Sequence, residues 1–428
     1  MKKLFRFFLP TGVALLLFVA LPLSAYAQSS ALQFFRPYDQ RGLHVFETSK
    51  EDTVAFDGFK LKWGAAFTQQ FQGLTHSNDA APNVVDGVDQ NALPEIGNGF
   101  NLATANLNLD AQLADGIRVN LITYLSSRHH PEAWVKGGYL QVDKLPMLNS
   151  AALDNLMRYV TIRAGHFEIN YGDTHFRRTD NGNALYNPFV GNYLLDAFTT
   201  EIGTEVYVQS NGFLAMGAIT GGEIKGAVER PEDRAPAFYG KLGIDRQVSP
   251  DLRVRLTGSA YTTSKSLNNT LHSGDRAGSR YYAVVDGGDW SGRLRSPFNS
   301  EVTAFMINPF VKFQGLELFG TLEWVEGRGA SEPETRSLNQ YGVEAIYRFL
   351  PNEQLYVGAR YNVVSGELLS ADSEITVDRW QVGAGWFVTP NILVKGEYVT
   401  QAYEDFPSAD IRHGAEFSGL MIEGVIAF

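Results

Sequence analysis

Apolar and polar residues alternate along most of the chain from Phe59 onward, with a period of two. In the first such stretch, Phe59, Leu61 and Trp63 alternate with Lys60 and Lys62. A period of two puts every second side chain on the same face of a strand, so the pattern predicts strands with one apolar face. It predicts about 16 strands, at 59–71, 106–113, 117–128, 133–143, 158–169, 197–209, 212–221, 237–247, 251–263, 301–313, 316–326, 338–349, 353–364, 375–388, 391–402 and 413–428.

The connections between these stretches alternate between short and long. The short ones consist of tight-turn residues, such as Asp115-Gly116, Gln314-Gly315 and Pro390-Asn391. A membrane barrel whose chain starts and ends on one side has short turns on that side and long loops on the other. We therefore expect an all-β fold, a transmembrane antiparallel β-barrel with short periplasmic turns and long extracellular loops. The long connections are 75–98, 170–196, 222–236, 264–300, 327–337, 365–374 and 403–412.

Three places fit this scheme less well. The connection from Arg128 to Glu132 is short for an extracellular loop, and the one from Lys144 to Met157 is long for a periplasmic turn. Pro309 lies inside a predicted strand although it has no N–H to donate to a neighbouring strand. The pattern therefore determines the register of the 301–313 strand least.

The last predicted strand runs to the end of the sequence. One of its faces is wholly apolar, which fits a strand that faces lipid and pairs to close a barrel. We expect it to close against the strand at 59–71. The outward face is predicted to carry Leu420, Ile422, Gly424, Ile426 and Phe428, and the inward face Met421, Glu423, Val425 and Ala427.

Residues 1–27 have the features of a secretory signal peptide. Lys2, Lys3 and Arg6 form a positive region, an apolar stretch follows, and Ala25-Tyr26-Ala27 is a small-x-small cleavage site. We expect a signal peptide at 1–27, an N-terminal periplasmic or lumen-packed segment at 28–57 and the barrel at 58–428. Export by this route fits the outer membrane of a Gram-negative-type bacterium.

Composition agrees with this picture. The chain has no cysteine, so its stability does not depend on disulfides. Its formal charge is −11, and loss of Lys2, Lys3 and Arg6 would make it −14, which argues against nucleic acid as a partner. Beyond the signal peptide no apolar run approaches the roughly 20 residues of a transmembrane helix, as expected when lipid-facing and lumen-facing residues alternate.

Charged residues fall on the face that the alternation places inward. One interpretation is a charge-lined passage that biases which solutes enter. The other is mutual pairing that holds the barrel wall and gives no selectivity; the two are compatible. The candidate lumenal arginines from the strands are Arg118, Arg163, Arg253, Arg255, Arg348 and Arg360.

The loop at 170–196 is the leading candidate for a constriction. Long loops without secondary structure are often functional, and this one carries both charge signs and several aromatic residues. We expect it to fold inward, with Arg177 and Arg178 set against Asp173 and Asp180; a surface loop is the alternative. For the longer loop at 264–300 an inter-subunit latch, a second constriction and a surface cap all stay open.

Catalytic, metal and cofactor motifs have little support. Most of the eight histidines fall in connections, and none has a nucleophile motif beside it. The adjacent pair His129-His130 would point apart on a strand, so we interpret it as incidental. Walker and dinucleotide-binding fingerprints do not occur in the strand–helix context that they require. We therefore expect no enzyme, no metal and no cofactor.

These features resemble those of bacterial outer-membrane general porins. The stretch from Tyr159 to Phe167, followed by Tyr171-Gly172, looks like the approach to the constriction loop in porins of the phosphate-selective type. The resemblance implies a porin fold, a pore, a homotrimer, and a role for Phe428 in the signal read by the barrel-assembly machinery. Phosphate selectivity is not carried over, because the chain is acidic and its inward residues mix both charge signs.

The leading functional hypothesis is a water-filled pore for passive diffusion of small hydrophilic solutes and ions across the outer-membrane lipid. A substrate-specific channel for phosphate, carboxylates or sugars is the first alternative. An outer-membrane enzyme or adhesin with a plugged barrel is the second. A count of about 16 strands favours a pore, because barrels with far fewer strands are filled by their own side chains.

Overall fold

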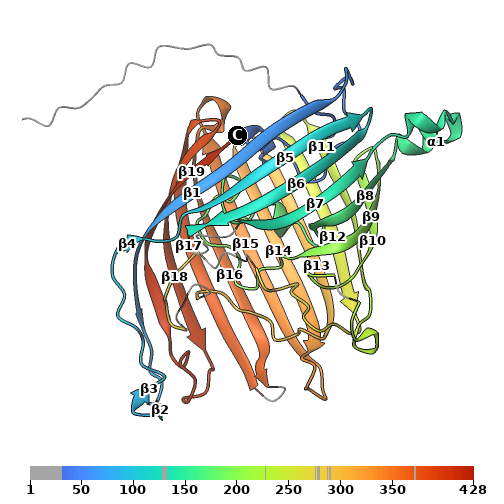
Figure 1. The fold of residues 1–428 in the computed structure, drawn as a ribbon. Coiled ribbons are helices and arrows are strands. Elements are labelled where there is room, and N and C mark those ends of the chain that lie inside the picture. The colour runs from blue at the N-terminus through green and yellow to red at the C-terminus, as the bar shows by residue number, and fades with distance from the viewer. Residues whose placement is uncertain are drawn as a thin grey trace, which may run out of the picture. The chain divides into compact units, whose positions relative to one another are not determined.

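Sixteen strands form one closed antiparallel barrel in the part of the chain that the structure describes (Figure 1). The computed structural model describes residues 31–127, 133–226, 228–274, 276, 280–286, 288, 291–370 and 373–428. The predicted signal peptide and the connection with His129-His130 lie outside these residues. The barrel strands are β1 (Lys60–Ser77), β5 (Thr104–Ala114), β6 (Ile117–Ser126), β7 (Trp134–Val142), β8 (Val160–Glu168), β9 (Thr200–Ser210), β10 (Phe213–Thr220), β11 (Ala237–Ser249), β12 (Leu252–Thr263), β13 (Glu301–Phe313), β14 (Leu316–Arg328), β15 (Arg336–Phe349), β16 (Leu355–Ser370), β17 (Ser373–Thr389), β18 (Ile392–Glu404) and β19 (Glu416–Ala427).

The barrel closes where the sequence predicted. Strand β19 pairs with β1 from Ala66 opposite Ala427 to Ser77 opposite Glu416. The carbonyl of Phe428 accepts a hydrogen bond from the amide of Ala65, and the amide of Phe428 donates one back, both at 3.0 Å. The last residue therefore continues the ladder, and no edge of the sheet is left open.

One end of the barrel carries turns and the other carries loops. At the turn end, which is uppermost in Figure 1, most connections have two to five residues, but 143–159 is longer and contains α1 (Ala151–Met157). The loop end carries β2 (Val84–Val85), β3 (Val88–Asp89) and β4 (Gly99–Phe100). Short 3₁₀ helices lie at Gln40–Gly42, Pro146–Leu148, Thr174–Phe176, Pro231–Asp233 and Pro351–Glu353.

The prediction of a loop at 365–374 is wrong for most of this range. Strand β16 continues to Ser370 and β17 begins at Ser373, with a register shift between Gly366 and Ser370. Glycine and serine weaken the strand signal in this stretch, whereas pairing across the hairpin extends both strands.

Pro309 is accommodated inside β13. It lies opposite Leu256 of β12, and on the other side the pairing with β14 keeps one register from Ile307 to Phe310. The residue beside it on β14 is Gly320, where an added Cβ would lie 2.8 Å from the proline ring. The missing side chain of Gly320 therefore leaves room for the ring where Pro309 cannot donate.

The outward face of the barrel is apolar. Trp63, Phe428 and Leu420 are among the large hydrophobic residues that stay exposed. The opposite face of β19 is buried, including Met421 and Glu423. This is the alternation expected of a wall between lipid and lumen. Among the described residues no helix combines the length and the apolar character needed to cross a membrane.

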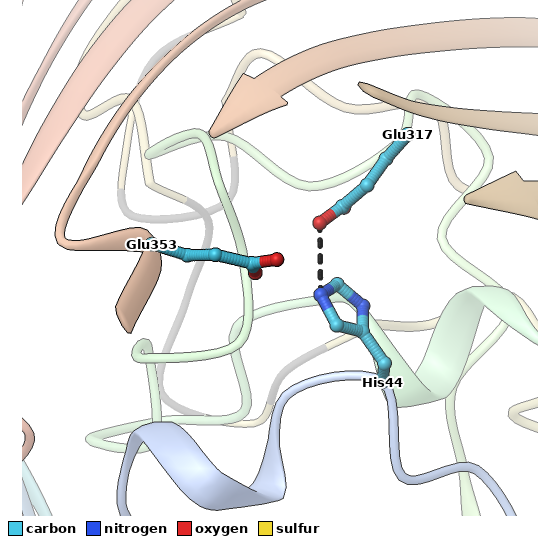
Figure 2. Close-up of side chains that lie close together, drawn as sticks. All are labelled: His44, Glu317 and Glu353. Carbon is cyan, nitrogen blue, oxygen red and sulfur yellow. Dashed lines mark ion pairs between the residues drawn. The ribbon is translucent and has the colours of Figure 1, made fainter. Parts of the chain in front are cut away.

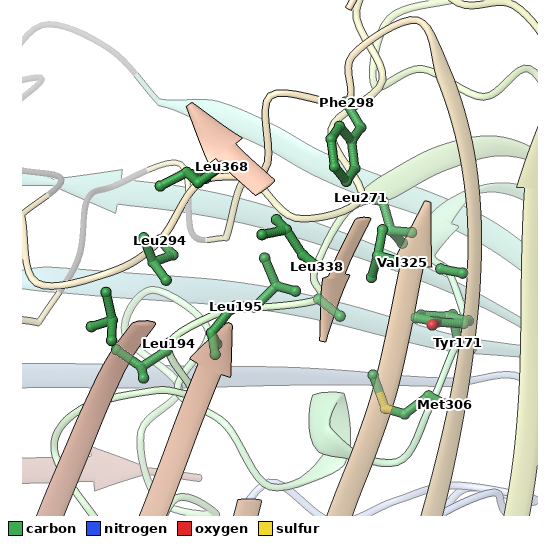
Figure 3. Close-up of a cluster of buried hydrophobic side chains, with 14 of the residues drawn as sticks. Tyr171, Leu194, Leu195, Leu271, Leu294, Phe298, Met306, Val325, Leu338 and Leu368 are labelled. Carbon is green, nitrogen blue, oxygen red and sulfur yellow. The ribbon is translucent and has the colours of Figure 1, made fainter. Parts of the chain in front are cut away.

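The inward face is not polar throughout the described barrel. Near the loop end, Met306, Val325 and Leu338 are buried inside the barrel (Figure 3). Two loops cover them, the loop at 169–199 with Leu194 and Leu195, and the loop at 264–300 with Leu271, Leu294 and Phe298. The two loops pair directly, since the amide of Leu294 donates to the carbonyl of Leu194 at 2.9 Å. Apolar residues face inward here because the loops keep water away from them.

Candidate pore and its charged lining

The loop at 169–199, called the inner loop below, crosses the barrel interior and is almost wholly buried. Arg177 anchors it to the wall, because its Nη2 lies 2.6 Å from Oε1 of Glu344 on β15 and 3.2 Å from Oε2 of Glu317 on β14. Arg360 on β16 shares the carboxylate of Glu344 at 2.7 Å. Charges removed from water require such partners.

Inward polar side chains of the wall also hold the backbone of the inner loop. Lys395 on β18 donates to the carbonyls of Ala184, Asn187 and Phe189, each at 2.8 Å. Glu397 accepts from the amide of Val190 at 2.8 Å. Since backbone groups buried without partners are costly, these residues explain why a loop without regular structure is stable inside the barrel.

Asp173 is the second anchor of the inner loop. It is fully buried and accepts hydrogen bonds at 2.8 Å from Arg255 and Thr257 of β12, and Lys241 of β11 lies 2.9 Å away. Burial alone would raise the pKa of Asp173, but Arg255 and Lys241 hold it well below its usual range. Asp173 is thus a charged structural anchor.

The predicted pairing inside the loop is wrong for Arg177 and Asp173. Both residues pair with the barrel wall instead. Arg178 pairs with Asp196 at 2.6 Å, and Asp180 lies within ion-pair distance of Lys136 on β7. Arg177, Asp173 and Asp180 thus have partners on barrel strands, whereas the partner of Arg178 lies in the inner loop itself.

Residues 31–59, called the N-terminal segment below, pack inside the turn end. Gln33 bonds to Gln112 of β5, Tyr38 bonds to Asp110, and Lys50 lies 3.1 Å from Asp143. Glu47 lies 2.8 Å from Arg255. Burial would raise the pKa of Glu47, but Arg255 and Lys241 lower it to about 2. The segment is therefore bound to several strands at once.

A central cavity of about 200 Å³ lies between the inner loop, the N-terminal segment and the inward faces of β5 to β8. Its walls include the partly exposed aromatic rings of Phe35, Tyr38, Tyr139 and Phe176. The charged residues among its described lining are the cations Arg36, Arg118, Lys136, Arg163 and Arg178 and the anions Glu47, Glu168 and Asp180.

Arg163 is the strand arginine that faces this cavity most openly. Its side chain is 22% exposed, and its Nη1 lies 3.2 Å from a carboxylate oxygen of the buried Glu205. The guanidinium also lies 4.7 Å from the ring centre of Tyr139. A second cation of the cavity wall, Lys136, also has a carboxylate partner, because its Nζ lies 2.9 Å from Glu168. Arg163 is thus paired from behind and open in front, whereas the side chain of Lys136 is only 4% exposed.

Two further cavities lie toward the ends of the barrel. The cavity near the loop end, of about 470 Å³, is lined by Arg276, Arg293, Arg295, Arg412 and one carboxylate, Asp286. A cavity of about 370 Å³ at the turn end includes Lys50, Arg158, Arg253 and Arg255 with Glu47, Glu51 and Asp245. The second shares Glu47 with the central cavity, whereas the lining of the first includes Thr199, the residue before Thr200 of the central cavity.

His44, Glu317 and Glu353 bring potential metal ligands within 4.8 Å of one another (Figure 2). Nε2 of His44 lies 2.8 Å from Glu317, but Arg348 and Lys312 already lie 2.5 Å from Glu317 and Glu353. Burial lowers the pKa of His44 to about 4, although Glu317 opposes the change. The carboxylates already have cations, so we assign this group to fixing the N-terminal segment on β14.

The predicted site residues therefore fall into three places. Arg118, Arg163, Arg178 and Asp180 line the central cavity. Arg253 and Arg255 line the cavity at the turn end. Asp173, Arg177, Arg348 and Arg360 are buried in ion pairs that hold the inner loop or the N-terminal segment.

Sequence reasoning missed three residues of the central cavity. Lys136 and His166 lie on predicted strands, but each is an odd number of residues from an inward residue of its own strand, Gln141 or Arg163, so alternation would place both outward. The structure breaks the alternation beside each of them, with a register shift between β6 and β7 and a positive φ at Gly165 of β8. Arg36 lies in a segment with no period, so no pattern could place it in the lumen.

Comparison with known proteins supports the fold. No family model and no curated protein matches the chain. In structure it is similar to an anion-selective porin from Comamonas acidovorans, at 11% identity over 86% of this chain and 100% of that one, with a TM-score of 0.53. It is also similar to the trimer form of OmpT, an outer-membrane protein of Vibrio cholerae (11% identity, 87% and 100% covered, TM-score 0.51), and to OprB of Pseudomonas putida (8%, 86% and 94%, 0.51). The fold is that of an outer-membrane barrel.

Proposed function

We propose that this protein is an outer-membrane porin through which small hydrophilic solutes diffuse passively, and that it prefers anions. The observation that carries the proposal is the charge of the three cavities. In each, the described lining holds more lysine and arginine than aspartate and glutamate, although the whole chain has a formal charge of −11. A solute in a narrow passage responds to the nearest side chains and far less to the distant outer surface.

Two other features support a pore. A barrel of 16 strands is wide enough to hold a water-filled lumen around an inner loop. The central cavity shares Glu47 with the cavity at the turn end, and its Thr200 follows Thr199 of the cavity near the loop end. One of the similar structures is described as an anion-selective porin, which is consistent with this preference.

The test is conductance of the purified full-length protein in a planar lipid bilayer. KCl is placed at different concentrations on the two sides of the bilayer. The zero-current potential should then have the sign of a channel that is more permeable to chloride than to potassium. Absence of discrete channel openings after repeated insertion would overturn the pore itself. A zero-current potential near zero or of the opposite sign would leave the pore standing and overturn the anion preference.

We also propose a homotrimer in the outer-membrane lipid, export by a signal peptide at 1–27, and assembly through the carboxyl-terminal strand that ends at Phe428. Support comes from the lipid-facing position of Phe428 and from the trimer form of the similar OmpT.

Chemical cross-linking in isolated outer membranes should give a ladder that stops at three subunits. Phe428→Ser should reduce the amount of folded protein in that membrane, and unchanged amounts would contradict the role of Phe428.

A further inference from the structure

The cations of the central cavity differ in how fully they are paired. Arg118 lies 2.6 Å from Asp110, Lys136 lies 2.9 Å from Glu168, and Arg178 lies 2.6 Å from Asp196. Arg163 has Glu205 behind it at 3.2 Å. Each of these four cations therefore already has a carboxylate partner.

Arg36 is different. Its Nε donates to the carbonyl of Gly42 and its Nη2 to the carbonyl of Phe176, both at 3.1 Å. Among the described residues no carboxylate lies within 4.0 Å of its guanidinium nitrogens, and its Nη1 has no hydrogen-bond partner there. The guanidinium rests 4.0 Å from the ring centre of Tyr186, which fixes its plane. Arg36 is thus a positioned cation that makes no direct ion pair among the described residues, although Glu168 and Glu47 are near enough to act on it electrostatically.

The space beside Arg36 suits one ring. The cavity measures about 200 Å³, and a cavity of about 150 Å³ is known to hold benzene. Partly exposed aromatic side chains line it, including Phe35, Tyr38, Tyr139 and Phe176. Aromatic walls favour a flat ring, and a guanidinium favours a carboxylate by charge-assisted hydrogen bonds.

From this geometry we infer that the central cavity is a saturable binding site for a small aromatic carboxylate, with Arg36 as the partner of the carboxylate. The inference rests on the proposed pore function and adds its substrate class. It also assigns recognition to the N-terminal segment, because Arg36, Phe35 and Tyr38 all precede the first barrel strand.

Channel block by matched solutes tests the site. Benzoate added at fixed KCl should reduce the chloride current of the full-length protein in a saturable way. Acetate has the charge without the ring and benzyl alcohol the ring without the charge, so neither should block at the same concentration. Inorganic phosphate serves as the third comparison, because it carries charge and hydrogen-bond acceptors but no ring.

Variants at two arginines of the same segment separate the site from general charge. Arg36→Gln should raise the half-blocking concentration of benzoate by about tenfold, whereas Arg36→Lys should retain part of the block. Arg41→Gln removes the same charge from a side chain that is 65% exposed and paired with Asp39, and it should leave the block unchanged.

The outcomes are distinguishable. Open channels that benzoate does not block would overturn the site and leave the proposed pore intact, whereas a protein that forms no channels would overturn the pore. Equal block by acetate or phosphate would overturn the aromatic specificity. Equal loss of block in Arg36→Gln and Arg41→Gln would overturn the role of Arg36. Calorimetric binding of benzoate to the wild-type protein in detergent gives a readout that does not depend on how well the variants insert, and absence of saturable binding would overturn the site.

Discussion

The two sides of the barrel wall carry the same kinds of inward residue but differ in what covers them. On β8, which faces the central cavity, the side chains of Arg163 and Glu168 are each 22% exposed. On β15 and β16, beneath the inner loop, Glu344 and Arg360 are 0% and 1% exposed. The first side is called the open side below and the second the covered side. We therefore expect an inward charge to act on solutes only where the inner loop leaves it uncovered.

This contrast bears on the two interpretations of the inward charges, a charge-lined passage and a wall held by mutual pairing. On the covered side, Glu344 binds Arg177 and Arg360 together, and this arrangement builds the wall and fixes the loop. On the open side, Arg163 keeps a partner and still faces the cavity. We therefore expect structural pairing and solute selection to be functions of different parts of the same barrel.

The strongest test of the covered side is Glu344→Gln. The change keeps the side-chain volume but leaves Arg177 and Arg360 without their shared carboxylate, so the free energy of unfolding should fall by about 3 kcal/mol. Denaturant titration of the protein in detergent measures it. The matched control is Glu301→Gln, whose partner Arg328 is 39% exposed, and it should change stability by less than about 1 kcal/mol. Equal effects would contradict the structural role of the ion pairs buried beneath the inner loop.

Deleting 174–183 should have the next largest effect. The deletion removes Arg177, Arg178 and part of the inner loop from the lumen, so single-channel conductance should rise by about twofold or more. Deleting 84–89, an exposed hairpin tip at the loop end, is the control and should leave conductance unchanged. Unchanged conductance after the first deletion would show that the inner loop does not limit the passage.

The fold was predictable because its signal is local. Strand alternation and tight turns each depend on a few consecutive residues, so the strand number and the closure at Phe428 followed from the sequence. The hairpin of β16 and β17 was predicted too short, because its tip is stabilised by pairing across the strands while its own residues have weak strand propensity.

The site was predictable only in part, because coverage is a long-range property. Alternation places Arg163 and Arg360 on the same inward face, and nothing near either residue tells which one the inner loop will cover. The partners of Arg177 are 140 and 167 residues away in the chain. The position of Arg36 in the lumen could not be predicted for a related reason. It is set by contacts with Gly42, Phe176 and Tyr186 and not by a repeating pattern.

A pair of arginine variants tests the contrast directly through ion selectivity. Arg163→Gln removes a charge that faces the cavity, so the ratio of chloride to potassium permeability should fall by about half. Arg360→Gln removes a charge beneath the inner loop and should lower stability while leaving that ratio unchanged. Zero-current potentials in a KCl gradient measure both. A larger shift for Arg360→Gln than for Arg163→Gln would reverse the assignment of the two sides.

Acid should loosen the N-terminal segment from the wall. The pKa of His44 is lowered from 6.5 to about 4 when the segment is bound, so a released segment takes up a proton more readily in that interval. Glu317, Glu353, Arg348 and Arg177 are charged groups near His44. Binding of the segment should therefore weaken as pH falls from 6.5 toward 4, by about 1 kcal/mol at pH 5.5.

The measurement uses the absence of cysteine in the chain, which makes Ser49→Cys a unique labelling site on the exposed part of the segment. Fluorescence anisotropy of a dye attached there should fall as pH is lowered through this interval. His44→Gln removes the titrating group, so it should abolish the change above about pH 4.5 and leave the later loss that follows protonation of Glu47, whose pKa is about 2 in the bound state. An unchanged profile in His44→Gln would assign the acid response to other groups, and the segment would then be held on β14 without a contribution from His44.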